Sequence, residues 1–167
     1  MIIRFSILFG FLTLLTVGAF YGPFLISSAE SNPKATEVDQ VTDPTAGHVL
    51  DMFRFEPDFV HLPIGAEVIF NNSRGQHTVH SISGLIPDGV KDISIANTTT
   101  STRTMDVPGL YVLTCKVHGR YGMVMLIAVG EPETWTNPPE TWTKKLTNHP
   151  GKKLDLLLAK LRESVGS

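Results

Sequence analysis

Hydrophobic and polar positions follow three different patterns along this chain of 167 residues. Residues 5–26 form an apolar run without a charged side chain. From residue 48 to residue 130, short stretches rich in Val, Ile, Phe and Thr alternate with Pro, Gly, Asn and Asp. After residue 151, leucines recur with the spacing of one helix face. The chain therefore divides into an apolar N-terminus, a central region of short elements and a C-terminal helix.

The central region predicts an all-β domain. Val68 and Phe70 alternate with Glu67, which is typical of a strand with one buried face. Residues 123–129 are apolar throughout, which is typical of a central strand buried on both faces. About eight short strands separated by turn residues predict a β-sandwich or barrel. The predicted strands are 48–55, 58–62, 66–71, 76–82, 92–96, 102–106, 109–115 and 122–130.

Residues 1–29 predict a signal peptide or a membrane anchor. Arg4 precedes the apolar run, and the small residues Ser27 and Ala29 suit cleavage before Glu30. The run 5–26 is also long enough to span a bilayer as a hydrophobic helix. We expect a cleaved secretory signal, with membrane anchoring through residues 5–26 as the alternative. Either way the rest of the protein is periplasmic or otherwise extracytoplasmic, soluble or tethered by its N-terminus.

Two segments flank the predicted β-domain 47–130. Residues 30–46 are polar with two prolines, and they predict a linker or a poorly ordered lead-in strand. Residues 131–167 form a C-terminal extension that ends in an amphipathic helix opening near Pro150–Gly151. One face of this helix is expected to pack on the β-domain through its leucines, Leu154, Leu157, Leu158 and Leu161.

Composition and charge exclude several classes of protein. With 14 basic and 16 acidic residues the net charge is −2, so there is no basic field for nucleic acid. The one cysteine, Cys115, excludes an intrachain disulfide framework, iron–sulfur clusters and any site that needs two thiolates. A metal site built on a single thiolate is still allowed.

The segment around Cys115 carries candidate metal chemistry. Cys115, His118 and Met123 form the pattern C-x2-H-x4-M between two predicted strands, and His77 stands at the head of an earlier strand. Two imidazoles, one thiolate and a weak thioether are the ligand set of a mononuclear type 1 copper site. Thiolate and thioether stabilise Cu(I), whereas imidazole binds both oxidation states. The spacing therefore predicts one copper ion held by His77, Cys115, His118 and Met123, for electron transfer.

Other interpretations of the same residues are weaker. A cysteine beside a histidine resembles a nucleophile and its base, but the loop contains no acid or amide to orient the base. Strand alternation places His80 on the face opposite to His77. Three histidines lack any ligand spacing, namely His48, His61 and His149. We therefore expect neither a cysteine hydrolase nor a second metal site.

Residues 48–130 resemble a cupredoxin, specifically the pseudoazurin branch. The similarity rests on Phe-Glu-Pro-x-Phe-Val at 55–60, on QHTVHSISGLIPDGV at 76–90 and on the ligand loop and last strand at 108–130. It implies a Greek-key β-sandwich with two C-terminal helices and the same four copper ligands. It also implies an electron carrier of a respiratory or photosynthetic chain rather than an enzyme.

The resemblance further implies that redox partners, a cytochrome or a copper or haem enzyme, dock near His118. The apolar docking patch is expected to include Leu85, Ile86 and Pro87, besides Gly119, Tyr121 and Gly122 of the ligand loop. Lys116 and Arg120 flank the loop as a modest positive rim.

Two departures from the family pattern concern residues beside the ligands. Thr78 replaces the usual Asn after the first histidine, and its hydroxyl is expected to make one hydrogen bond between the ligand loops rather than two. Val117 replaces the usual Pro before the second histidine, which adds a backbone N–H. If the loop follows the family's path, this N–H lies close to the sulfur of Cys115.

Two alternative functions are compatible with the same site. The length of the apolar N-terminus is compatible with a membrane-tethered copper subunit of a larger redox complex. A copper-trafficking protein is less favoured, because its usual Met-rich or His-rich tracts are absent from this sequence. A copper oxidase or nitrite reductase would need a further copper centre with its own histidines.

Overall fold

The computed structural model describes residues 35–135, 142 and 145–166. The predicted signal peptide or anchor, residues 1–29, lies outside this part of the chain. No helix among the described residues is long and apolar enough to cross a membrane.

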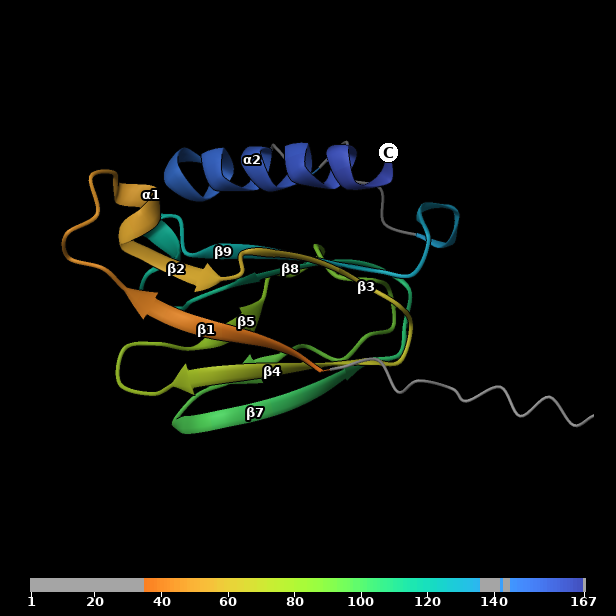
Figure 1. Cartoon of the computed structure of the whole chain (residues 1–167), viewed down its shortest axis with the longest axis horizontal. Coiled ribbons are helices and arrows are strands. Elements are labelled where there is room, and N and C mark those ends of the chain that lie inside the picture. The colour runs from red at the N-terminus through yellow and green to blue at the C-terminus, as the bar shows by residue number, and fades with distance from the viewer. Residues whose placement is uncertain (1–34, 136–141, 143–144, 167) are drawn as a thin grey trace, which may run out of the picture. The chain divides into compact units, whose positions relative to one another are not determined.

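Two β-sheets face each other and form a sandwich (Figure 1). One sheet has four strands in the order β2 (Phe53–Glu56), β1 (Thr36–Thr42), β4 (Ala66–Ser73) and β7 (Thr98–Met105). The other has five in the order β3 (Phe59–Leu62), β9 (Val124–Val129), β8 (Gly109–Thr114), β5 (Val79–Ser81) and β6 (Ser94–Ile95). The chain passes repeatedly between the sheets, which confirms the predicted all-β sandwich, with nine strands among the described residues rather than about eight.

The five-stranded sheet separates two hydrophobic cores. On one face, residues such as Phe70, Leu113 and Ile127 fill the space between the sheets. On the other face, Leu126 and its neighbours pack under the C-terminal helix. Alternate residues of β9 enter the two cores, which confirms that the apolar run 123–129 is a strand buried on both sides.

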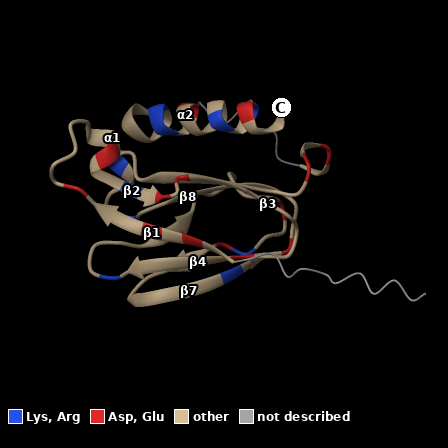
Figure 2. Ribbon diagram, viewed as in Figure 1, with Lys and Arg blue, Asp and Glu red and all other residues tan. Residues whose placement is uncertain are grey.

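The C-terminal helix α2 (Asn148–Val165) lies along the five-stranded sheet (Figure 1). Its buried face carries the leucines expected from the sequence, Leu154, Leu157, Leu158 and Leu161. Lys and Arg alternate with Asp and Glu along the helix (Figure 2). The carboxylate of Asp58, which precedes β3, forms ion pairs with the ammonium groups of Lys153 at 2.7 Å and Lys160 at 2.6 Å. These ion pairs connect α2 to the sandwich.

Strand β1 lies within residues 30–46, the segment predicted as a linker or a poorly ordered lead-in strand. It pairs antiparallel with β2 and parallel with β4, so this part of the segment belongs to the sandwich. Val38 and Gln40 point inward, while Glu37 and Asp39 are exposed. Gln40 hid this alternation because it is polar but points inward, where its Nε2 donates to the Asn71 carbonyl at 3.0 Å and to the Ser73 hydroxyl.

The predicted strand 48–55 is wrong in its first half. Residues Val49–Met52 form a single helical turn, α1, and extended structure begins only at Phe53. The Nδ1 atom of His48 accepts the N–H of Leu50 at 3.2 Å and caps this turn. Leu50 is the buried residue of α1. Two short 3-10 turns complete the described elements, η1 (Gly119–Tyr121) and η2 (Pro132–Thr134).

Candidate metal centre

The four predicted copper ligands come from two loops at one end of the sandwich. His77 lies between β4 and β5, whereas Cys115, His118 and Met123 lie in the loop between β8 and β9. The pairing of Thr114 with Val124 brings Cys115 beside Met123, and the Cys115 N–H donates to the Met123 carbonyl at 3.2 Å. The sandwich therefore gathers residues far apart in the sequence.

Three of the four ligand side chains form a compact buried cluster. One ligand atom each from His77, Cys115 and His118 lie within 4.8 Å of one another. The Cys115 sulfur is 3.7 Å from Nδ1 of His118, and the two imidazole rings are 5.0 Å apart at their centroids. Met123 is fully buried in the same core as Cys115, and its role as the fourth ligand stays a prediction.

The orientation of His77 fits a metal ligand. Its Nε2 atom lies 2.9 Å from the hydroxyl of Thr42, which fixes the ring from outside. Its Nδ1 atom is buried and has no hydrogen-bond partner. A buried polar atom left in this way costs about 1–3 kcal/mol, and a bound cation would remove that cost. Together with the imidazole of His118 and the thiol of Cys115, this imidazole nitrogen forms a donor set that fits copper.

Electrostatics keeps both histidines in the form that binds a metal. Burial lowers the pKa of His77. Burial also lowers the pKa of His118, and the nearby His77 and Arg120 lower it further. The neutral imidazole is therefore favoured at neutral pH, and metal binding requires a neutral imidazole.

Thr78 links the two ligand loops more fully than expected. Its hydroxyl oxygen accepts the Lys116 N–H at 2.9 Å, and the same hydroxyl donates to the Cys115 sulfur at 3.8 Å. A hydroxyl has one donor and two acceptor positions, so both contacts form at once. The expectation of a single bond was wrong because it left the sulfur out of account.

The expected bond from the Val117 N–H is not among the contacts of the Cys115 sulfur. For the described residues, these contacts are the Thr78 hydroxyl, the Gln76 carbonyl at 3.4 Å and Nδ1 of His118. Thr78 in the loop between β4 and β5, rather than the residue next to His118, thus supplies the donor to the sulfur.

The surroundings of His118 differ from the predicted apolar patch. Leu85, Ile86 and Pro87 are buried, and Leu85 packs in the core beneath α2. His118 is itself only 4% exposed, because Phe53 covers one face of its ring. The two rings are 3.9 Å apart and nearly parallel, at 4°. Val117, which is 38% exposed, is the exposed large hydrophobic residue of the ligand loop.

Sequence reasoning missed Thr42 and Phe53. Thr42 stood in the predicted linker, and Phe53 stood in a predicted strand without any link to His118. The motif at 55–60 begins two residues further on and gave no contact between Phe53 and His118.

The remaining histidines described above have other surroundings. His48 caps α1, and Nε2 of His61 lies 2.9 Å from the Gly130 carbonyl. His80 lies in β5, opposite Ser94 and Thr114. In the described part of the chain, the His77, Cys115 and His118 cluster is the one group of His, Cys, Asp and Glu side chains with metal-binding spacing.

Comparison with known proteins agrees with this geometry. Residues 44–130 match the family of copper binding proteins described as plastocyanin/azurin. A candidate pseudoazurin of Rhizobium leguminosarum bv. viciae is 36% identical over 82% of this chain and 87% of its own. The pseudoazurin of Paracoccus pantotrophus is 32% identical over 64% of this chain and 72% of its own. The crystal structure of pseudoazurin from Methylobacterium extorquens AM1 superposes with a TM-score of 0.62 at 27% identity, covering 76% of this chain and 98% of that one.

The two facing sheets and the buried His/Cys/His cluster define a type 1 copper protein with the cupredoxin fold. The chain belongs to the plastocyanin/azurin family of copper-binding proteins, in its pseudoazurin branch. It is a copper electron-transfer protein and not an enzyme.

Proposed function

We propose that this protein shuttles single electrons between redox partners outside the cytoplasm, through one copper ion held by His77, Cys115, His118 and Met123. The observation that carries the proposal is the buried cluster of three ligand atoms within 4.8 Å of one another. Copper bound there would supply a one-electron Cu(II)/Cu(I) couple. The proposed partners are a cytochrome or a copper or haem enzyme of a respiratory or photosynthetic chain.

The protein's own contribution is to hold the ligands rigidly and away from water. Both imidazoles are buried and each contacts a fixed neighbour, Thr42 for His77 and Phe53 for His118. Because these contacts do not involve the metal, the side chains need little rearrangement when the charge of the site changes. A small rearrangement is the condition for fast electron transfer.

We place partner docking at the end of the domain that carries His118. The ring of Phe53 is half-buried and stacks on His118, so it extends the ligand toward the surface. Lys116 and Arg120 are exposed on either side of Val117 and His118 and would favour an acidic docking face. The contact is expected to be small, as is usual for electron-transfer partners.

The visible spectrum of the purified chain, loaded with Cu(II), tests the copper site. We expect an intense band from charge transfer between the Cys115 sulfur and the metal, and we expect Cys115→Ser to abolish it. Met123→Leu should keep the band but shift its position and the reduction potential. Met125→Leu is the matched control, because Met125 is equally buried in the same core. A colourless wild-type protein would disprove the proposal.

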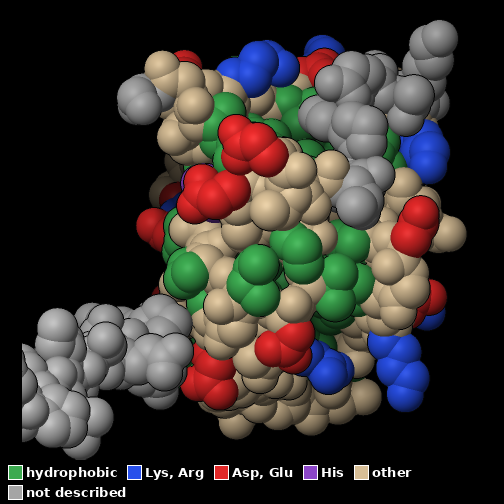
Figure 3. All heavy atoms as spheres, turned by 90° about the vertical axis from the view of Figure 1, so that its right-hand side faces the viewer, with side chains coloured by type: hydrophobic (Ala, Val, Ile, Leu, Met, Phe, Trp, Pro, Cys, Tyr) green, Lys and Arg blue, Asp and Glu red, His purple; other side chains and the backbone are tan. Residues whose placement is uncertain are grey.

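We propose a membrane-tethered form as the alternative, and the position of β1 bears on it. The domain enters the sandwich at Thr36, the first residue of β1, whereas Thr42 at the end of β1 contacts His77. Strand β1 therefore begins at the end of the sandwich opposite to the copper ligands. Hydrophobic side chains gather on the right-hand face of the molecule in Figure 1, which is the face shown in Figure 3.

The register places two exposed hydrophobic residues at this opposite end. Ile64 is 52% exposed and Val107 is 41% exposed. The two residues lie in adjacent turns, which are joined by a hydrogen bond from the Gly65 N–H to the Met105 carbonyl at 2.9 Å. Their exposure leaves this end of the domain free for an apolar contact away from the copper ligands. Intact mass of the protein from native membranes tests this form: a chain that starts at Met1 supports it, and one that starts at Glu30 excludes it.

A further inference from the structure

We propose that the connection between β1 and β2 acts as a histidine clamp that positions both imidazole ligands, and that Arg54 fixes it. The histidine clamp consists of Thr42, Phe53 and the residues between them, 43–52. This inference rests on the proposed function, because it takes His77 and His118 as the copper ligands. Arg54 contacts neither histidine in the described contacts and is therefore a positioning residue.

The two ends of the clamp are one cross-strand pair. Thr42 and Phe53 are register partners where β1 and β2 meet the copper end of the sandwich. The Thr42 hydroxyl lies 2.9 Å from Nε2 of His77, and the Phe53 ring stacks at 3.9 Å on the ring of His118. Two ligands from separate loops are thus held from outside by side chains that face each other across a single ladder position.

The middle of the clamp makes a third contact with the ligand loop. Leu50 of α1 is buried against Gly122, so closely that a β-carbon added at Gly122 would lie 2.5 Å from Cδ2 of Leu50. The Asp43 N–H donates to the Met52 carbonyl at 2.8 Å and closes the connection at its base. The connection is therefore packed against the loop that carries Cys115, His118 and Met123.

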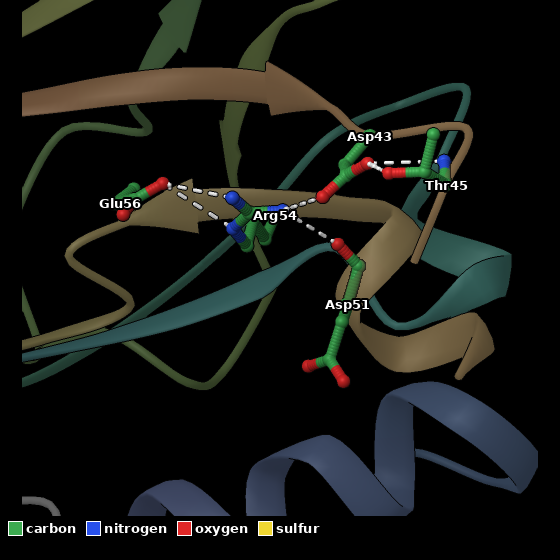
Figure 4. A network of polar contacts seen from close by, with 5 residues as sticks. All are labelled: Asp43, Thr45, Asp51, Arg54 and Glu56. Atoms are coloured by element: carbon green, nitrogen blue, oxygen red, sulfur yellow. Dashed lines mark hydrogen bonds and ion pairs between the residues drawn. The ribbon is translucent and has the colours of Figure 1, made fainter. Parts of the chain in front are cut away.

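Arg54 joins the parts of the connection to one another (Figure 4). Its Nη1 donates to the Asp51 carbonyl at 2.8 Å and lies 3.6 Å from the Asp43 carboxylate, and its Nη2 donates to Glu56 at 3.1 Å. Asp43 also accepts the N–H and the hydroxyl of Thr45, at 3.0 and 2.7 Å. One planar guanidinium thus holds the start of the connection, α1 and β2, a geometry that a lysine ammonium does not provide.

Removal of the guanidinium should therefore loosen both histidines together. Without Arg54, Asp43 and Asp51 lose their common partner, and residues 43–52 between Thr42 and Phe53 lose this side-chain cross-link. The substitution alters neither histidine chemically, so a change in the NMR signals of a histidine ring reports a change in the position of that ring. Residues that orient metal ligands typically affect metal affinity 10–100-fold, in order of magnitude.

The test uses the full chain with Arg54→Gln. Two readouts are taken: histidine-ring NMR signals in the metal-free and Cu(I)-loaded protein, and Cu(I) affinity by competition with a chelator. Thr42→Val and Phe53→Leu show how large a shift follows from losing each direct contact. Arg103→Gln and Thr102→Val are controls, because both residues are exposed on β7 at the other edge of the same sheet.

We expect Arg54→Gln to shift or broaden the ring signals of both His77 and His118 and to weaken Cu(I) binding about tenfold. The controls should leave all these signals at their wild-type positions. A folded Arg54→Gln protein in which one histidine or neither responds overturns the inference. The metal-free ring signals report on the clamp even if the wild-type chain does not bind copper, so failure of the proposed function is recognised separately.

Discussion

The hydroxyl of Thr78 lies 3.8 Å from the sulfur of Cys115 and donates to it, while its oxygen accepts the Lys116 N–H at 2.9 Å. One small side chain thus spans the two loops that supply the copper ligands. Two functions follow from this position, namely holding the loops together and withdrawing electron density from the sulfur.

Thr78→Val should lower the reduction potential of the copper-loaded protein. Sulfur donation favours Cu(II) over Cu(I), and the hydroxyl weakens that donation, so its loss stabilises the oxidised state. A hydrogen bond to a charged acceptor contributes about 1.5–3 kcal/mol, of which only the difference between oxidation states counts, so we expect a decrease on the order of tens of millivolts. Cyclic voltammetry at one pH measures it. Thr78→Ser, which keeps the hydroxyl, is the control, and an unchanged or higher potential in Thr78→Val would contradict the assignment.

Val117→Pro should change the potential less than Thr78→Val. The backbone N–H removed by proline is not among the hydrogen bonds of the Cys115 sulfur. Val117 is also 38% exposed, so the substitution disturbs little packing. The same voltammetry compares both variants with the wild type. A larger decrease in Val117→Pro would show that its N–H, and not the Thr78 hydroxyl, acts on the sulfur.

The ligand loop and the β-sandwich were predictable because their signals are local. Cys115, His118 and Met123 occupy one short loop, and β9 is apolar at every position. Leu85 was placed wrongly in a surface patch, because its burial depends on the second core under α2. From the sequence alone, an apolar loop residue is compatible with a surface patch and with a core. For Leu85, only the packing of α2 decides between the two.

The contacts around the ligands were not predictable for a different reason. Thr42 and Phe53 contact the histidines because β1 and β2 pair in one particular register. That register depends on β1, in which the inward-pointing residue Gln40 is polar. The sequence of β1 therefore shows no hydrophobic alternation that would mark it as a strand. Support of this kind comes from tertiary pairing rather than from any motif in the sequence.

Asp58→Asn should destabilise the protein by about 3 kcal/mol at pH 7, since it leaves the buried Lys153 without a counter-charge. Lys160→Gln is the control and should cost under about 1 kcal/mol, because Lys160 is half exposed and Lys153 still pairs with Asp58. Urea unfolding followed by circular dichroism measures both. Equal losses in the two variants would show that the burial of Lys153 does not matter.

The effect of Asp58→Asn should also depend on pH. Burial raises the pKa of Asp58, but hydrogen bonds and charges from Lys153 and Lys160 outweigh it and lower the pKa below the ordinary 3.8. The carboxylate therefore stabilises the fold fully above the unfolded-state pKa, and this stability is lost as the pH falls through the folded-state pKa. The difference between wild type and variant should shrink below about pH 4. A difference that stays constant from pH 7 to pH 3 would contradict this linkage.

Gly122→Ala should destabilise the fold by about 2–4 kcal/mol, combining a strained backbone with overpacking. Gly122 has φ +98, and an added β-carbon would lie 2.5 Å from Cδ2 of Leu50. Gly65→Ala separates the two causes, since Gly65 has φ +82 but open space around its β-position, and it should cost only about 1 kcal/mol. Leu50→Ala in the Gly122→Ala background should recover part of the loss, despite its own cost in the wild type. Urea unfolding of the metal-free proteins measures all four, and additive losses in the double variant would show that Leu50 and Gly122 are not in contact.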